Sequence, residues 1–258
     1  MRKYSIFAIT FFWAILCAQI LAAQNLAAQS SEIHVLASNG IKAVIEDLLP
    51  QAEQTVGRKI AVQYSPTANI KQSIEAGAAF DVAIVTPEAI AGLIQEGKVV
   101  DGTGTPISRA GVGIAIRKGG PRPDITTPEA IKSALLNVKA VAFAPQGAST
   151  TTILQMLDSL GIAEAVKAKT ISLQGSDLTI AAVLDGRADF VITLVSELLP
   201  VKGLEVLGPL PDKFQHYVSF SAAVGTAAKD PQASKAFIKF LAGPAALPAI
   251  TARGMQPH

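Results

Sequence analysis

The sequence is poor in residues on which several common kinds of protein depend. It has one cysteine, Cys17, and its three histidines, His34, His216 and His258, are far apart. A single cysteine excludes a disulfide framework within the chain, and scattered histidines lack the close spacing of zinc ligands. The sequence therefore predicts no metal site, and the fold must be stabilised by its hydrophobic core.

A long apolar run occurs only at the N-terminus. Arg2 and Lys3 precede residues 5–21, which are almost all apolar, and two alanines follow. This order is typical of a signal peptide, so we expect residues 1–23 to be removed on export, together with the only cysteine. No later run is long enough to span a membrane. The expected location of the mature chain is the periplasm of a Gram-negative bacterium.

An excess of one charge is also absent. The full chain has 22 Lys and Arg residues against 20 Asp and Glu, and loss of Arg2 and Lys3 with the signal peptide leaves 20 of each. Nucleic acids and anionic membranes are bound through clustered positive charge. The sequence therefore predicts neither partner, and it favours a monomer that binds a small ligand.

Motifs for nucleophilic catalysis and for phosphate-bearing cofactors are missing as well. The segment Gly147-Ala148-Ser149 lacks the second glycine of a nucleophile elbow. No glycine-rich loop ends in the Lys-Ser/Thr pair of a P-loop. No cofactor is expected.

What the chain does contain is a strand, a hydroxyl residue and a helix in direct succession. Residues 34–37 predict a strand, Ser38 and Asn39 follow it, and apolar residues recur on one helical face from Ile41 to Ala52. The first N–H groups of a helix have no partner within the helix, so such a helix start binds negatively charged atoms well. A lone serine at this place is more often an ordinary helix cap.

The same arrangement occurs at two further places, which favours binding over capping. The strand at residues 141–144 leads through Ser149 and Thr150 into a helix with one apolar face. The strand at residues 60–64 leads through Thr67 into a short helix. Ordinary turn chemistry is the alternative role for Thr67.

A longer order of residues is also duplicated. Residues 74–86 and residues 182–193 each run from a helix end through Gly and Asp to an apolar strand that ends near a threonine, which is Thr193 in the second copy. We infer an α/β protein with two similar lobes, each with a mixed, mostly parallel sheet and flanking helices. Parallel sheets bind ligands at the carboxyl ends of their strands, so the helix starts should face a cleft between the lobes.

The predicted lobes are discontinuous in sequence, with the first lobe formed by residues 32–109 and 217–258 and the second by residues 110–216. Residues 110–116 and 217–224 are the expected crossing strands. Arg109 lies at the first crossing, where a guanidinium is well suited to bind a carboxylate or oxyanion. Most arginines are instead solvated.

Two later turns of the second lobe carry further polar residues. Ser176 or Asp177 is expected to cap the helix that follows the strand at residues 170–173. Glu197 follows the strand that ends near Thr193. It is the acidic candidate for proton transfer, although an exposed carboxylate at a helix start is the commoner role of such a residue.

Three segments of the sequence resemble the periplasmic solute-binding proteins of the molybdate-binding type, which serve ATP-driven importers. They are Val35-Leu36-Ala37-Ser38, residues 74–84 with Ile74-Glu75-Ala76-Gly77 and Asp81-Val82-Ala83-Ile84, and residues 233–241. The resemblance implies the two-lobe type II binding-protein fold and a membrane permease as partner. The ligand would be a small anion, either an oxyanion such as molybdate or a small carboxylate.

By position, the resemblance implies Ser38 and Thr67 as ligand-binding residues of the first lobe and Ser149 as one of the second. We expect further ligand-binding residues at the same cleft, namely Asn39, Arg109, Thr150 and Thr193. The chain departs from the family pattern near Leu194, where the family has a ligand-binding tyrosine, because leucine cannot donate a hydrogen bond.

Residues 108–117 and 254–257 are more similar to a divergent subgroup of this family. Some proteins similar to that subgroup are enzymes that interconvert cis- and trans-aconitate. A transport receptor is therefore the first hypothesis and a small-acid isomerase the alternative. An isomerase needs a base that moves a proton, and Glu197 is the candidate.

Overall fold

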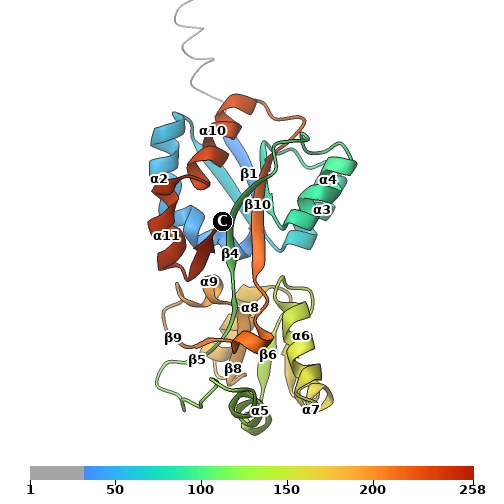
Figure 1. Ribbon diagram of the computed structural model, residues 1–258, viewed down its shortest axis with the longest axis vertical. Helices are drawn as coiled ribbons and strands as arrows, with labels where there is room; N and C mark the ends of the chain where they lie inside the picture. Colours follow the sequence, from blue (N-terminus) through green and yellow to red (C-terminus); the bar gives the residue numbers. More distant parts are fainter. Residues whose placement is uncertain (1–31) are drawn as a thin grey trace, which may run out of the picture.

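The computed structural model describes residues 32–258 and shows two lobes, each built on its own β-sheet (Figure 1). The predicted two-lobe α/β architecture is confirmed. The predicted signal peptide lies outside the described residues. Within residues 32–258, no helix has both the length and the hydropathy needed to cross a membrane.

The first lobe contains a six-stranded sheet in the order β11-β4-β10-β3-β1-β2. Its strands are β1 (Ile33–Ser38), β2 (Ile60–Ser65), β3 (Val82–Val85), β4 (Thr105–Ala110), β10 (Val218–Val224) and β11 (Met255–Pro257). β1 pairs with β2 and β3 in parallel, whereas β10 and β11 run antiparallel to their neighbours. Ile33, Val35 and Ala37 pack into one core cluster and Leu36 into another. Because strand side chains alternate between faces, this sheet is buried on both sides.

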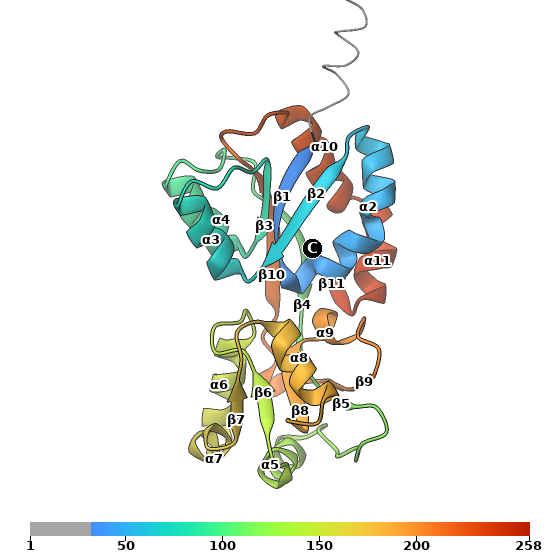
Figure 2. The ribbon, with the colours of Figure 1, turned by 180° about the vertical axis from the view of Figure 1, so that it is seen from behind.

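Helices cover both faces of the first sheet, with α2, α10 and α11 on one side and α3 and α4 on the other (Figures 1 and 2). The helical segments of this lobe are η1 (Asn39–Ile41), α2 (Lys42–Val56), α3 (Thr67–Glu75), α4 (Pro87–Gln95), α10 (Pro231–Leu241), η3 (Pro244–Ala246) and α11 (Leu247–Ala252).

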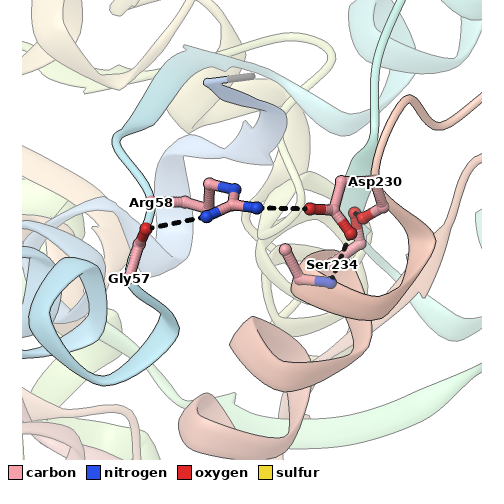
Figure 3. A network of polar contacts seen from close by, with 5 residues as sticks. Gly57, Arg58, Asp230 and Ser234 are labelled. Carbon is pink, nitrogen blue, oxygen red and sulfur yellow. Dashed lines mark hydrogen bonds and ion pairs between the residues drawn. The ribbon is translucent and has the colours of Figure 1, made fainter. Parts of the chain in front are cut away.

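The start of α10 is tied to the turn after α2 (Figure 3). The Nη1 atom of Arg58 donates to the carbonyl oxygen of Gly57 at 3.1 Å, and its Nη2 atom lies 3.4 Å from Oδ2 of Asp230. Asp230 also accepts a 2.9 Å bond from the backbone N–H of Ala233, and its carbonyl oxygen accepts one from Ser234. These contacts fix the C-terminal part of the chain on the first lobe.

The second lobe contains a five-stranded sheet in the order β7-β6-β8-β5-β9. Its strands are β5 (Val112–Arg117), β6 (Val141–Phe143), β7 (Thr170–Ser172), β8 (Phe190–Leu194) and β9 (Leu204–Pro209). Its helical segments are α5 (Pro128–Asn137), α6 (Thr150–Ser159), α7 (Ala163–Lys167), α8 (Ser176–Leu184), α9 (Val195–Leu198) and η2 (Asp212–Phe214). β6 pairs in parallel with β7 and β8, as β1 does with its neighbours.

The chain passes between the lobes twice, along neighbouring paths (Figure 1). β4 ends at Ala110 in the first sheet and β5 begins at Val112 in the second, so the first passage is made at Gly111. Gln215, on the return path, accepts a bond from the backbone N–H of Val112 at 2.8 Å and donates to its carbonyl oxygen at 2.9 Å. The two passages are therefore hydrogen-bonded to each other, next to the predicted lobe boundaries.

Candidate functional site

A cavity of about 40 Å³ lies between the two lobes, and we call it the inner cavity. The first lobe contributes residues that end or follow β1 and β2, namely Ser38, Asn39, Gly40, Pro66, Thr67 and Asn69. The second lobe contributes residues that follow β6 and β7 or lie near the end of β8, namely Ala144, Gln146, Gly147, Ala148, Gln174, Gly175, Ser176, Thr193 and Glu197. The carboxyl ends of parallel strands from both sheets thus meet at one place, where such sheets bind their ligands.

The three longer helices that begin beside the inner cavity have no side-chain caps. Neither α3, α6 nor α8 receives a hydrogen bond from the side chain of its N-cap residue. Three helices that begin elsewhere are capped by a side chain, α4 by Thr86, α5 by Thr127 and α10 by Asp230, whereas α2, α7, α9 and α11 are not. The backbone N–H groups at the cavity therefore keep their capacity to bind an anion.

Two of the predicted hydroxyl residues of the first lobe lie at the inner cavity. Ser38 is only 2% exposed, and its side chain does not cap η1, which follows it. The Oγ1 atom of Thr67 is buried and has no hydrogen-bond partner among the described residues. Leaving a buried hydroxyl unpaired costs about 1–3 kcal/mol. A ligand that accepts a hydrogen bond from Thr67 would remove this cost.

The second lobe places a carboxyl group at the same cavity. The Oγ atom of Ser176 lies 2.9 Å from Oε1 of Glu197, and Thr193 is hydrogen-bonded to Oε2. Glu197 is partly exposed where it lines the cavities, and protein encloses the rest of its carboxyl group. This burial raises the pKa of Glu197 above that of a free glutamate, while the bonds from Thr193 and Ser176 act in the opposite direction.

A second, larger cavity of about 350 Å³ adjoins the first, and we call it the outer cavity. Asn39, Ser176 and Glu197 line both cavities. Lys42 and Glu46 from α2 and Asp177 from α8 line only the outer one. A ligand group too large for the inner cavity can therefore extend toward these charges.

The structure does not place Ser149 and Thr150 in the wall of the inner cavity. Thr150 uses its hydroxyl locally, because Oγ1 accepts from the backbone N–H of Gly147 and donates to the carbonyl oxygen of Ala144, both at 2.8 Å. Thr150 thereby holds the loop whose residues line the cavity. Ser149, the N-cap residue of α6, is 5% exposed and does not line the inner cavity. The expectation that both side chains line the cleft is corrected accordingly.

Arg109 also lies away from both cavities. Its Nε atom donates to Oε1 of Gln256 at 2.8 Å, and its guanidinium stacks 4.7 Å from the ring centroid of Tyr217. The cause is strand register, since Arg109 is directly opposite Ser219 of β10 and Gln256 of β11. Arg109 therefore supports the first sheet and does not face the cleft as expected.

The expected helix cap of α8 is a further correction. Gly175, with φ of 90°, is the N-cap residue, and it provides no side-chain bond. Ser176 is the first residue of the helix, and its hydroxyl turns toward Glu197. Ser176, Gln146 and Gln174 line the cavity but were not predicted to do so. Each follows a predicted strand, and this position could have identified them from the sequence.

The resemblance places the family's ligand-binding tyrosine near Leu194. Leu194 is 1% exposed, and its Cδ1 atom lies 2.6 Å from where a Cβ atom on Gly40 would be. Leu194 therefore packs against the first lobe instead of offering a donor. Among residues 32–258, no group of three or more His, Cys, Asp or Glu side chains is arranged to hold a metal ion.

A family model described as bacterial extracellular solute-binding protein matches residues 33–256. The chain belongs to this family. This solute-binding protein is 26% identical over 243 residues to an aconitate isomerase from a Pseudomonas species, covering 92% of this chain and 91% of the relative. It is 28% identical over 243 residues to the molybdate-binding protein ModA of Azotobacter vinelandii, covering 88% of this chain and 91% of the relative.

Solved structures have the same fold. The periplasmic molybdate-binding protein of Azotobacter vinelandii superimposes with a TM-score of 0.75 at 16% identity, covering 87% of this chain and 98% of that one. The sulfate-binding protein SubI of Mycobacterium tuberculosis superimposes with a TM-score of 0.67 at 18% identity, covering 88% of this chain and 87% of that one. At these identities the likeness establishes the two-lobe fold of the solute-binding protein and nothing finer.

Proposed function

We propose that this solute-binding protein is the periplasmic receptor of an ABC-type importer and that it captures a small anion between its lobes. The observation that carries the proposal is that two uncapped helix starts, those of α3 and α8, lie in the wall of one interlobe cavity, beside the loop that leads into α6. The unpartnered hydroxyl of Thr67 lies in the same wall. Helix starts and hydroxyls bind an anion without a counter-charge.

The size of the inner cavity limits the group that it encloses. A water molecule needs about 10–15 Å³ of such volume, so 40 Å³ holds roughly three water-sized groups. This volume suits one tetrahedral oxyanion or one carboxylate. A larger acid would place one carboxylate in the inner cavity and the rest in the outer cavity beside Lys42.

The test is a thermal-shift panel of the mature protein with molybdate, sulfate, citrate, and cis- and trans-aconitate. A ligand that binds only the folded protein stabilises it by about 2.7 kcal/mol at a hundred times its Kd. Calorimetry on Ser38→Ala and Thr67→Val should then show binding that is weaker by about 1.5–3 kcal/mol each. Thr55→Val, an exposed site on α2, is the matched control. Unchanged affinity in both cavity variants would overturn this assignment of donors.

The buried carboxyl group favours a second candidate function, isomerisation of a small unsaturated polycarboxylic acid. Glu197 has a raised pKa and lines the ligand cavity. Such a group can take a proton from a methylene carbon next to a carboxylate and return it to the other end of the same allylic system. The similarity to aconitate isomerase supports this candidate.

Receptor and isomerase are distinguished by turnover. The protein is incubated with cis- and with trans-aconitate in heavy water and followed by NMR. Deuterium incorporation or a change in double-bond geometry, lost in Glu197→Gln, would establish the isomerase. Binding without either change would establish the receptor.

A further inference from the structure

Glu197 lies in the wall between the inner and outer cavities, where two hydroxyl groups hold it. Ser176 bonds to one carboxyl oxygen and Thr193 to the other. Ser176 is 8% and Thr193 is 6% exposed, and all three residues line the inner cavity. The three side chains form a cluster inside the ligand site, and we call it the carboxyl cluster.

The number of hydrogens in the carboxyl cluster decides what it offers to a ligand. Each hydroxyl has one hydrogen to donate, and an ionised carboxylate has none. When Glu197 is ionised, both hydroxyl hydrogens point at its oxygens. Ser176 and Thr193 then turn only lone pairs toward the cavity, next to a negative charge. In this state the cluster repels an anion.

Protonation of Glu197 reverses this arrangement. The protonated carboxyl group donates its own hydrogen to one of the two hydroxyls and accepts from the other. The first hydroxyl can then direct its hydrogen into the cavity. The site loses a negative charge and gains a donor in the same step, so an anion binds the protonated form more tightly.

The charged groups around the carboxyl cluster act in the same direction. α2 contributes Lys42 and Glu46 to the outer cavity, and α8 contributes Asp177, whose negative charge opposes ionisation of Glu197. The inner-cavity residues from the first lobe and from the loop after β6 are uncharged. Lys42 is thus the only cation that lines either cavity, against three carboxylates. An incoming anion would add to this negative charge.

We propose that Glu197 couples ligand binding to the uptake of one proton, so that the site takes a fully ionised small anion together with H⁺. This inference rests on the proposed capture of an anion in the inner cavity. It makes Glu197 a determinant of specificity, because an ionised carboxylate rejects anions and a protonated one accepts them. By linkage, the affinity for the anion falls up to about tenfold for each pH unit above the pKa of free Glu197.

The experiment measures proton uptake by calorimetry in buffers of different ionisation enthalpy. The probe is molybdate, sulfate or trans-aconitate, whichever stabilises the protein in the panel above. The measurements are made from about pH 7.5 to about pH 9, well above the pKa of carboxyl groups, so titration of the probe itself does not contribute. We expect uptake that approaches one proton per anion as the pH rises, together with falling affinity.

Glu197→Gln separates proton coupling from a structural role. The glutamine amide donates to one hydroxyl and accepts from the other, as the protonated glutamate does, but it cannot ionise. We expect this variant to bind the probe with an affinity that no longer depends on pH and without proton uptake. Asp177→Asn, which removes a nearby charge and leaves the carboxyl cluster intact, should keep the uptake.

Each outcome decides between the two proposals. An anion that binds wild-type protein with constant affinity and no proton uptake overturns the coupling and leaves the receptor proposal intact. Proton uptake that persists in Glu197→Gln assigns it to another group and also overturns the coupling. If no probe binds at either end of the pH range, anion capture itself fails. Should Glu197→Gln not fold, the absence of proton uptake by the wild-type protein still overturns the coupling.

Discussion

The hydroxyl of Ser196 donates a 2.6 Å hydrogen bond to the carbonyl oxygen of Gly40. Ser196 belongs to α9 of the second lobe and Gly40 to η1 of the first, so the bond joins the lobes beside the inner cavity. Ser196 is only 3% exposed. Because a contact between lobes can form only when they are close together, this bond stabilises the closed arrangement.

Ser196→Ala should therefore weaken ligand binding without touching the ligand. A hydrogen bond of this kind contributes about 0.5–1.5 kcal/mol, which corresponds to a roughly two- to tenfold loss of affinity. Calorimetry with the anion identified in the thermal-shift panel measures the change. Ser133→Ala, an exposed serine on α5, is the control. Equal affinity in the two variants would show that the bond does not contribute to closure.

Gly40→Ala should prevent full closure of the lobes. A Cβ atom at this position would lie 2.5 Å from Cζ of Phe220 and 2.6 Å from Cδ1 of Leu194, which belongs to the other lobe. Overpacking of this kind costs about 1–3 kcal/mol. X-ray scattering at saturating ligand should give a larger radius of gyration than for wild-type protein. Gly104→Ala, whose Cβ atom would meet only Ile90 at 3.5 Å, should behave as wild type.

Asp81→Ala should destabilise the first lobe strongly. The carboxylate of Asp81 is 3% exposed and accepts from the backbone N–H groups of His34 at 2.8 Å and Lys229 at 2.6 Å. Bonds to a charged group contribute about 1.5–3 kcal/mol each, so we expect a loss of about 3 kcal/mol or more in urea unfolding. Asp189→Ala removes the equivalent but exposed carboxylate of the second lobe, and it should cost less because water replaces its bonds. A similar loss in both variants would contradict this explanation.

Glu197 should make the stability of the ligand-free protein depend on pH. Its pKa is raised in the folded state, so the folded protein holds this proton more tightly than the unfolded chain does. The resulting stabilisation is complete below the pKa of an unfolded glutamate and is lost as the pH rises through the raised pKa. Glu197→Gln cannot ionise, so it should gain stability relative to wild type as the pH rises from about 4.3, the pKa of an unfolded glutamate, through the raised pKa of the folded state.

Urea unfolding of both proteins across this pH range measures the difference. Glu129→Gln, at an exposed position in the first turn of α5, is the control and should follow wild type. A difference in the free energy of unfolding between wild type and Glu197→Gln that stays constant with pH would contradict the prediction.

The duplicated order of Gly, Asp, strand and Thr was informative because its structural role is local. Asp81 precedes β3 and Asp189 precedes β8, and each carboxylate accepts hydrogen bonds from two backbone N–H groups. The donors are His34 and Lys229 for Asp81, and Lys139 and Ala140 for Asp189. The equivalence ends at the threonine. Thr86 caps α4, whereas Thr193 bonds to Glu197. The motif therefore predicts the lobes but not the chemistry of the site.

Short elements at the edges were not predictable from periodicity. β11 has three residues and forms only because it pairs with β4, and β9 ends at Pro209. Proline is tolerated there because β9 is an edge strand that pairs only with β5. The partner strands β4 and β5 lie far from β11 and β9 in the sequence, so local periodicity does not predict these pairings.

The sequence by itself determined the succession of strands and helices and the positions of Ser38, Asn39 and Thr67 after strand ends, since these depend on local periodicity and chain direction. Only the tertiary structure decided which side chains share the cavity. Strand register places Arg109 opposite Ser219 in the first sheet, away from the cavity. The hydroxyl of Thr150 forms its hydrogen bond within the loop after β6. The raised pKa of Glu197 is likewise a product of tertiary structure, because burial between two lobes arises only when segments distant in sequence pack around one carboxyl group.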